Sequence, residues 1–227
     1  MDDLRVISAG DAALVVELPA RIDPVINVRL VSMAERLRRC CGSAILDAVV
    51  GYCTLTVYFD PLLVDAGWLE GKLRALAAED VAPADVEGVR IDVPVCYGGE
   101  LGPDLVSVAD TIGATVDDVI ALHCAPEYLV YVVGFVPGFA YMGVVDERLA
   151  LPRRAAPRTR VPSGSVAIAA GQTGIYPMET PGGWHLLGRT PLRPFDAARH
   201  EPVLFSPGDR VRFHPIDRAA FDRASSA

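Results

Sequence analysis

The 227-residue sequence predicts an α+β domain over residues 1–93 followed by an all-β barrel over residues 94–227. Three observations support this division. The first ninety residues alternate between strand-like and helix-like patterns. Residues 94–103 form a composition shift rich in glycine and proline, which is typical of a domain boundary. Beyond residue 128, short apolar runs alternate with glycine and proline. A chain of this length accommodates one large domain or two small ones, and the shift favours two.

The N-terminal domain is predicted to pack two helices on one face of an antiparallel sheet. Asp23 before Pro24 is a favourable helix start, because the carboxylate caps the first turn and proline fits the first helical position. The expected elements are a hairpin over residues 4–8 and 13–18, a helix after Asp23, a strand pair within 45–59, a helix through 68–77 and a strand over 89–95. This β-β-α-β-(β)-α-β order predicts a ferredoxin-like domain.

Two short helices are expected next, over residues 104–112 and from Thr115 to about His123. The Thr115 hydroxyl caps the second helix, and the two aspartates that follow suit its N-terminus. The later apolar runs cover residues 128–135, 165–170, 184–187 and 210–213. Closely spaced short strands of this kind favour a closed β-barrel, which leaves no sheet edge unpaired.

Charge and composition exclude several classes of protein. With 21 basic and 29 acidic residues the net charge is −8, which argues against nucleic acid or an anionic membrane as the main partner. The start of the chain has no signal-peptide pattern, and no apolar run is long enough to span a membrane. Five cysteines without a Cys-x-x-Cys pair argue against a disulfide framework and a structural zinc site. We therefore expect a soluble cytoplasmic protein without a bound metal.

The familiar catalytic signatures are absent from the sequence. There is no Gly-x-Ser-x-Gly motif, and no Gly-x-x-x-x-Gly-Lys-Ser/Thr loop, so ATP is not expected to bind this chain in the P-loop manner. The four histidines are scattered and form no metal-binding pattern.

Candidate functional residues lie in the glycine- and proline-rich second half. Arg158 belongs to a proline-spaced basic run (Arg153, Arg154, Arg158, Arg160), which suits an anion or a solvated loop. Phe139 lies in an aromatic and glycine-rich stretch, 134–143, typical of either a ligand wall or a tight barrel corner.

Four further candidates have equally open interpretations. Gln172 and Thr173 form a polar turn between glycines, suited to amide recognition or to turn capping. Arg189 follows a predicted strand, and it is either a residue that binds an anion or an ordinary surface residue. His123 lies near the end of a predicted helix. There it is either a structural cation or a general acid or base that Glu127 orients.

Many of these segments, in one order along the whole chain, resemble the family of 5-oxoprolinase B subunits, also called the KipI or allophanate hydrolase subunit 1 family. The segments that carry the resemblance are Cys96–Glu100, Gly102–Leu105, Leu122–His123, Pro126–Tyr128, Gly134–Phe135, Pro137–Phe139, Asp146–Leu149, Pro157–Arg158, Val161–Pro162, Gly164–Val166, Gln172–Pro177, Pro181–Trp184 and Gly188–Pro191, with Gly51–Tyr52 and Tyr58–Pro61 in the first domain.

This resemblance implies a ferredoxin-like domain and a cyclophilin-like barrel. It also implies two partners, a C-type subunit with a related barrel and a third, A-type subunit. Together the three convert 5-oxo-L-proline to L-glutamate with ATP hydrolysis. The chain alone is expected to be inactive. Relatives suggest two alternatives, a carboxyltransferase component of the urea-carboxylase or allophanate type and an inhibitor of a sensor histidine kinase. Prolyl isomerisation rests on fold analogy alone.

Within this interpretation, the seven candidate residues are expected to surround one cavity that binds a small lactam or amide. Arg189 and Arg158 would bind an anion, and Gln172 and Thr173 would recognise a carbonyl or amide group. The remaining roles are proton transfer for His123, a wall or hydroxyl donor for Tyr176, and an aromatic wall for Phe139.

Overall fold

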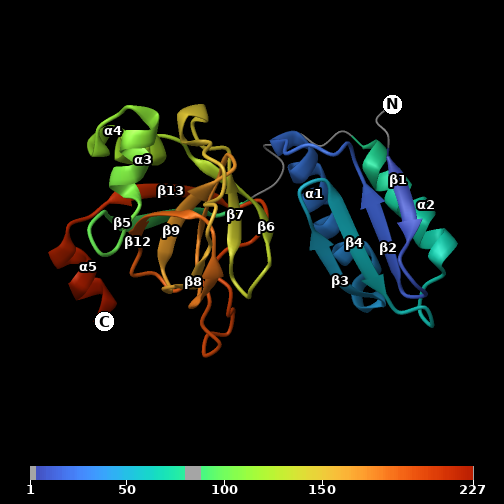
Figure 1. Cartoon of the computed structure of the whole chain (residues 1–227). Coiled ribbons are helices and arrows are strands. Elements are labelled where there is room, and N and C mark those ends of the chain that lie inside the picture. Colours follow the sequence, from blue (N-terminus) through green and yellow to red (C-terminus); the bar gives the residue numbers. More distant parts are fainter. Residues whose placement is uncertain (1–3, 80–87, 227) are drawn as a thin grey trace. The chain divides into compact units, whose positions relative to one another are not determined.

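The computed structural model describes residues 4–79 and 88–226, which form two compact units (Figure 1). The second unit begins at Gly88. In the described part of the chain, no helix is long and apolar enough to cross a membrane.

The first unit is a four-stranded antiparallel sheet covered on one face by two helices. Its strands have the order β1-β2-β4-β3, and one core contains alternate strand residues together with the apolar sides of α1 and α2. The elements are β1 (Arg5–Ser8), β2 (Ala13–Glu17), α1 (Pro24–Cys41), η1 (Gly42–Ala44), β3 (Ile45–Val50), β4 (Thr54–Phe59) and α2 (Ala66–Ala78). Asp23 caps α1 as predicted, since its side chain accepts a hydrogen bond from the Val25 N–H.

The domain boundary predicted from the sequence lies between residues 93 and 94, whereas the second compact unit begins at Gly88. The strand predicted over 89–95 is β5 (Arg90–Tyr97), which pairs with barrel strands and not with the first sheet. Without β5 the described elements of the first unit run β-β-α-β-β-α, which is not the β-α-β-β-α-β order of a ferredoxin-like fold. The ferredoxin-like prediction is therefore not confirmed.

The second unit contains the closed barrel that the sequence predicted. In the described residues it has seven strands in the order β10-β7-β6-β13-β5-β12-β9, and β9 pairs with β10 to close it. The barrel strands after β5 are β6 (Tyr128–Val133), β7 (Ala140–Gly143), β9 (Ser165–Ala169), β10 (Gln172–Ile175), β12 (His185–Arg189) and β13 (Arg210–Pro215). The cyclophilin-like label stays a prediction.

Other elements lie around this barrel. They are α3 (Leu105–Ile112), α4 (Val116–Cys124), η3 (Glu147–Leu149), the two-stranded ribbon of β8 (Arg158–Val161) with β11 (Thr180–Gly182), and α5 (Arg218–Ser225). Thr115 caps the start of α4 as predicted, and the Asp118 side chain also accepts a hydrogen bond from the Thr115 N–H, which completes a capping box. Gln172 and Thr173, expected in a polar turn, instead begin strand β10.

Strand β9 separates two apolar clusters. Val166 and Ile168 belong to the barrel core, whereas Ala167 and Ala169 belong to a second cluster. Because successive side chains of a strand point to opposite faces, the second cluster lies outside the barrel wall. This outer cluster also includes Val161 of β8 and is rich in aromatic residues. The outer face of β9 is therefore where the aromatic stretch of the sequence assembles.

We predict opposite effects for two glycine substitutions. At Gly102 a Cβ atom would lie 1.9 Å from the Leu187 carbonyl oxygen, so Gly102→Ala is expected to lower the free energy of unfolding by about 2–4 kcal/mol. Gly71, exposed within α2, has no atom within 4 Å of that position, and Gly71→Ala is expected to raise stability by about 0.5–1 kcal/mol. Urea unfolding followed by circular dichroism measures both. Equal stability of the two variants would contradict the close packing at Gly102.

Candidate functional site

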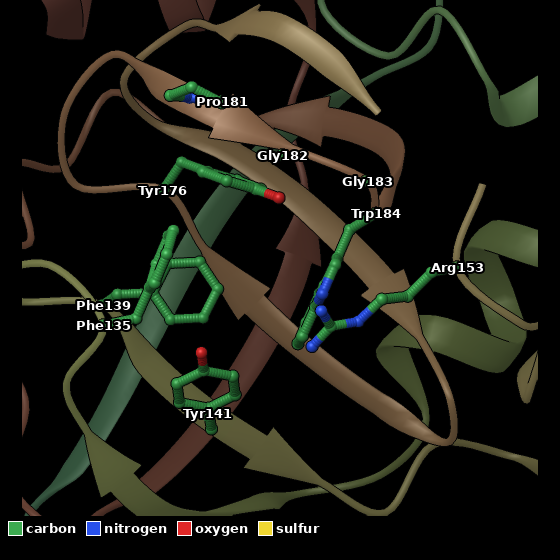
Figure 2. A pocket seen from close by; sticks show the side chains of 9 residues that line it. All are labelled: Phe135, Phe139, Tyr141, Arg153, Tyr176, Pro181, Gly182, Gly183 and Trp184. Carbon is green, nitrogen blue, oxygen red and sulfur yellow. The ribbon is translucent and has the colours of Figure 1, made fainter. Parts of the chain in front are cut away.

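A small aromatic pocket lies on the outer face of the barrel (Figure 2). Its volume is about 80 Å³, well below the roughly 300–1,000 Å³ of pockets for drug-sized ligands, so it suits a compact molecule. The lining residues come from the β6–β7 turn, β7, the ends of β10 and β12, β11 and the loop before β8. They are Phe135, Phe139, Tyr141, Arg153, Tyr176, Pro181, Gly182, Gly183 and Trp184.

Phe139 is the centre of the aromatic arrangement. Its ring centroid lies 4.7 Å from that of Tyr141, 5.2 Å from that of Tyr176 and 5.6 Å from that of Trp184. The latter two contacts are edge-to-face, the geometry that aromatic quadrupoles favour. Phe139, Tyr176 and Trp184 are buried. The pocket walls are therefore held by mutual packing before any ligand arrives.

Tyr176 is fixed by the backbone around Gly182. A Cβ atom at Gly182 would lie 2.2 Å from the Tyr176 hydroxyl, so the ring needs a residue without a side chain there. The backbone N–H of Trp184 donates to the Tyr176 oxygen, while burial raises the pKa of this phenol. The phenol therefore stays protonated, and its O–H proton is left to donate to a ligand.

Phe135 differs from the other rings because it is exposed and strained. Its φ is 71°, a conformation that costs a bulky side chain free energy, and 67% of its surface is accessible. Its ring contacts Phe139 edge-to-face at 5.9 Å. Strain at an exposed apolar residue beside a pocket is typical of ligand-binding sites.

The four arginines of the basic run have different environments. Arg154 and Arg158 bind Asp104, and Arg160 binds Glu179. Among the residues that the structure describes, Arg153 forms no ion pair with a carboxylate. Arg153 is thus the member of the run left to attract an anionic ligand.

Arg153 is directed at the aromatic pocket. Figure 2 shows its guanidinium beside the Trp184 ring, with the hydroxyls of Tyr141 and Tyr176 facing the same space. Burial raises the pKa of both phenols, and the charge of Arg153 opposes that rise at each. The pocket therefore combines aromatic walls, two phenol groups and one cation.

Asp104 organises the loop that carries Arg153. Its buried carboxylate accepts two hydrogen bonds from Arg158 and one from Arg154, each of 2.8 Å, and one of 2.7 Å from the Leu186 N–H. Burial alone would raise the pKa of Asp104, but these hydrogen bonds and the two arginine charges lower it. Asp104 is therefore ionised and ties the loop to α3 and β12.

His123 lies in the barrel core and not in the pocket. Tyr97 Oη is 2.7 Å from its Nδ1, and Thr173 Oγ1 is 2.8 Å from its Nε2. Because the Thr173 hydroxyl donates to the Ala167 carbonyl, it accepts from His123 Nε2–H, and Nδ1 accepts from Tyr97. Complete burial lowers the pKa of His123 to about 3.

This environment differs from the exposed helix end at which the sequence predicts a general acid or base. A buried imidazole with both nitrogens hydrogen-bonded stabilises the core, and the expected role of His123 in proton transfer stays a prediction. Glu127, suggested as its orienting group, instead pairs with Arg90 on the surface.

The seven predicted site residues do not surround one cavity. Phe139 and Tyr176 line the aromatic pocket, whereas Arg158, Thr173, His123, Gln172 and Arg189 do not line it. Arg158 donates two hydrogen bonds to Asp104, and its expected role as a substrate anchor stays a prediction. Gln172 and Arg189 begin and end barrel strands, and their expected roles stay predictions. No group of metal-ligating side chains occurs in residues 4–79 and 88–226.

Comparisons with known proteins reveal the relationships of this chain. A family model for the carboxyltransferase domain, subdomain C and D, matches residues 4–205. The 5-oxoprolinase B subunit of Escherichia coli O157:H7 is 41% identical over 218 residues, which cover 95% of this chain and 97% of that protein. This chain belongs to the family of 5-oxoprolinase B subunits. The resemblance predicted from the sequence is thereby confirmed.

Two solved structures extend the comparison. TTHA0988 is 38% identical to this chain, and the two structures align with a TM-score of 0.80. The match covers 90% of this chain and 40% of the longer TTHA0988 chain. The Kluyveromyces lactis urea amidolyase has a TM-score of 0.73 at 22% identity, covering 97% of this chain and 15% of that enzyme. At that identity the likeness concerns the fold alone.

The family segments identified in the sequence contain the pocket, although the prediction missed its polar residue. Tyr176, Trp184 and Phe139 lie in such segments, and Arg153 lies between two of them. Its neighbours in the basic run carry the same charge, so residue type could not separate it from them. What distinguishes Arg153 from Arg154 and Arg158 is that these two donate hydrogen bonds to Asp104, which lies 50 and 54 residues away in the sequence.

We predict that His123 makes stability depend on pH. The unfolded chain protonates this histidine below about pH 6.5, but the folded chain does so only near pH 3. The contribution of His123 to the free energy of unfolding is therefore fully present above about pH 6.5. It falls by about 1.4 kcal/mol per pH unit as the pH drops toward 3. In His123→Gln, the slope of unfolding free energy against pH between 6.5 and 4 should be shallower by that amount. The exposed His200→Gln variant is the control and should keep the original slope.

We also predict that Asp104→Asn destabilises the second unit. The asparagine cannot satisfy two guanidinium groups and the Leu186 N–H together, so we expect a loss of about 2–4 kcal/mol in urea unfolding. Glu179→Gln breaks the exposed pair with Arg160 and should change stability by less than about 1 kcal/mol. Similar losses in both variants would argue against a structural role for Asp104.

Proposed function

We propose that this chain is the B subunit of an ATP-dependent 5-oxoprolinase-type complex, and that its aromatic pocket binds 5-oxo-L-proline for conversion to L-glutamate. The names of its relatives support the first part. The observation that carries the second part is Arg153, a cation without a carboxylate partner in the described chain, at a compact pocket of aromatic rings.

The pocket offers a group for each chemical feature of this substrate. The carboxylate of 5-oxoproline would bind the Arg153 guanidinium, a pairing that is strong when partly shielded from water. The five-membered ring would lie against Phe139 and Trp184. Tyr176, whose oxygen already accepts the Trp184 N–H, would donate its O–H proton to the lactam carbonyl. Polarisation of that carbonyl is what opening of the lactam requires.

ATP would be used by the assembled complex. The pocket volume of about 80 Å³ suits the lactam and not a nucleotide, and the sequence contains no P-loop. We therefore propose that the active site is completed by homologues of the C and A subunits, the former with a related barrel. The relatives are named as the B member of a set, which supports such partners, and the longer TTHA0988 chain is consistent with a fused one.

A second candidate function is carboxyl transfer of the urea-carboxylase or allophanate type. The carboxyltransferase-domain family model favours it. This candidate also needs a pocket for a small planar amide, but urea itself, unlike 5-oxoproline, enters the reaction without a carboxylate for Arg153 to bind. The kinase-inhibitor and prolyl-isomerase alternatives remain predictions from the sequence. Assays with 5-oxoproline and with a urea-type substrate, on the same reconstituted complex, distinguish the two enzymatic candidates.

We predict that Arg153→Gln raises the KM for 5-oxoproline about tenfold or more in the reconstituted complex, because a charge-assisted hydrogen bond to the substrate is lost. Arg153→Lys should recover part of the affinity, since the charge remains but the planar fork does not. The measurement is 5-oxoproline-dependent ATP turnover with the partner proteins present.

The matched control is Arg160→Gln. Arg160 lies in the same basic run but is exposed and paired with Glu179, so its loss should leave the KM within about twofold. An unchanged KM in Arg153→Gln, in a complex that still assembles, would remove the substrate role of the pocket.

A further inference from the structure

Arg189 and Ser165 lie side by side on the outer wall of the barrel. They are directly opposite each other on the antiparallel strands β12 and β9. Opposite residues share a face, and Ser165 has the same orientation as Ala167 and Ala169 of the outer cluster. Both side chains therefore belong to the face that carries the aromatic pocket.

Both residues contain buried polar atoms without a partner. Ser165 is fully buried, and its Oγ has no hydrogen-bond partner. The Nε of Arg189 is also buried and unpartnered, although the side chain as a whole is partly exposed. Most buried polar groups in proteins are hydrogen-bonded, so two such atoms on facing residues are unusual. An acceptor brought by a ligand would satisfy them.

The aliphatic part of Arg189 packs against the backbone, and its charge is not neutralised by a carboxylate of the described chain. Its methylene groups pack on Gly164, where a Cβ atom would lie 3.2 Å from Arg189 Cγ and 2.6 Å from the Thr190 carbonyl oxygen. Within the described ranges Arg189 forms no ion pair with a carboxylate. Burial lowers the pKa of Arg189, and the charge of Arg218 adds to this effect, although Arg218 itself pairs with Asp222.

We propose that Arg189 and Ser165 form an oxyanion-binding subsite, separate from the Arg153 pocket, for the phosphoryl or carboxylate group of a ligand. An oxyanion accepts hydrogen bonds from the guanidinium and from a hydroxyl at once, and its charge compensates the partly buried cation of Arg189. The fixed, planar guanidinium suits two-point binding of such a group.

The subsite neighbours the aromatic pocket through the sheet. The Tyr176 N–H bonds to the Ser165 carbonyl on the adjoining strand, and Arg189 is one strand further. At about 4.8 Å per strand, the Cα atoms of Tyr176 and Arg189 are separated by roughly 10 Å. One ligand with two charged ends, or two small ligands, would fit this spacing. The proposal does not depend on which small molecule occupies the aromatic pocket.

The test is a titration of the ¹⁵N-labelled full-length chain with inorganic phosphate. The Nε–H signals of the arginines are followed by ¹H–¹⁵N NMR. The Arg189 signal is assigned by its loss in Arg189→Lys. We expect a saturable shift of this signal, and an affinity about tenfold weaker in Ser165→Ala because one hydrogen bond to a charged group is removed. A parallel titration with acetate at equal ionic strength distinguishes phosphoryl from carboxylate binding.

Two control variants make the result specific. Arg212→Gln removes an exposed arginine of β13, and Arg153→Gln removes the cation of the aromatic pocket. Both variants should keep the phosphate-dependent shift of Arg189. The result therefore tests the Arg189 subsite independently of whether 5-oxoproline binds the aromatic pocket. Absence of a saturable shift, or equal affinities in the wild type and Ser165→Ala, would overturn the proposal.

Discussion

The buried ion pair of Asp104 with Arg154 and Arg158 is the interaction on which the functional face depends. Its carboxylate joins three segments that are distant in sequence, namely the start of α3, the strand β12 and the loop before β8. A buried carboxylate tolerates this position only because four hydrogen bonds compensate its desolvation. Two arginines are thereby fixed, and Arg153, their neighbour in sequence, is left on the pocket side of the loop.

Packing of the aromatic rings provides the second constraint. Phe139 contacts four other rings, and one of these, Tyr176, fits only because Gly182 has no side chain. Close packing of this kind leaves little freedom for the walls to rearrange. The strained backbone at Phe135 is stable because the surrounding cluster compensates its cost. Rigid walls and one charged group favour selection of a small ligand by shape and charge.

Local signals predicted much of the fold, and long-range contacts explain the errors. The capped helices and the apolar strands are determined by residues within a few positions of one another, as at Asp23 and Thr115. Gln172 and Thr173 have a turn composition, yet pairing with β7 and β9 draws them into a strand. The strand β5 follows the first domain in sequence but pairs with β13, more than one hundred residues later. Such pairings leave no trace in local composition.

The same limit explains why site residues were harder to predict than the fold. His123, Arg158, Arg189 and Arg153 all have residue types suited to catalysis or anion binding, but their environments differ. Hydrogen-bond partners within the protein occupy polar atoms of His123 and Arg158, so fewer of these atoms remain for a ligand. Arg153 and Arg189 retain charge without a carboxylate in the described chain. In the two proposed sites, the carboxylate or phosphoryl group of a ligand would supply the negative charge that the described chain does not provide.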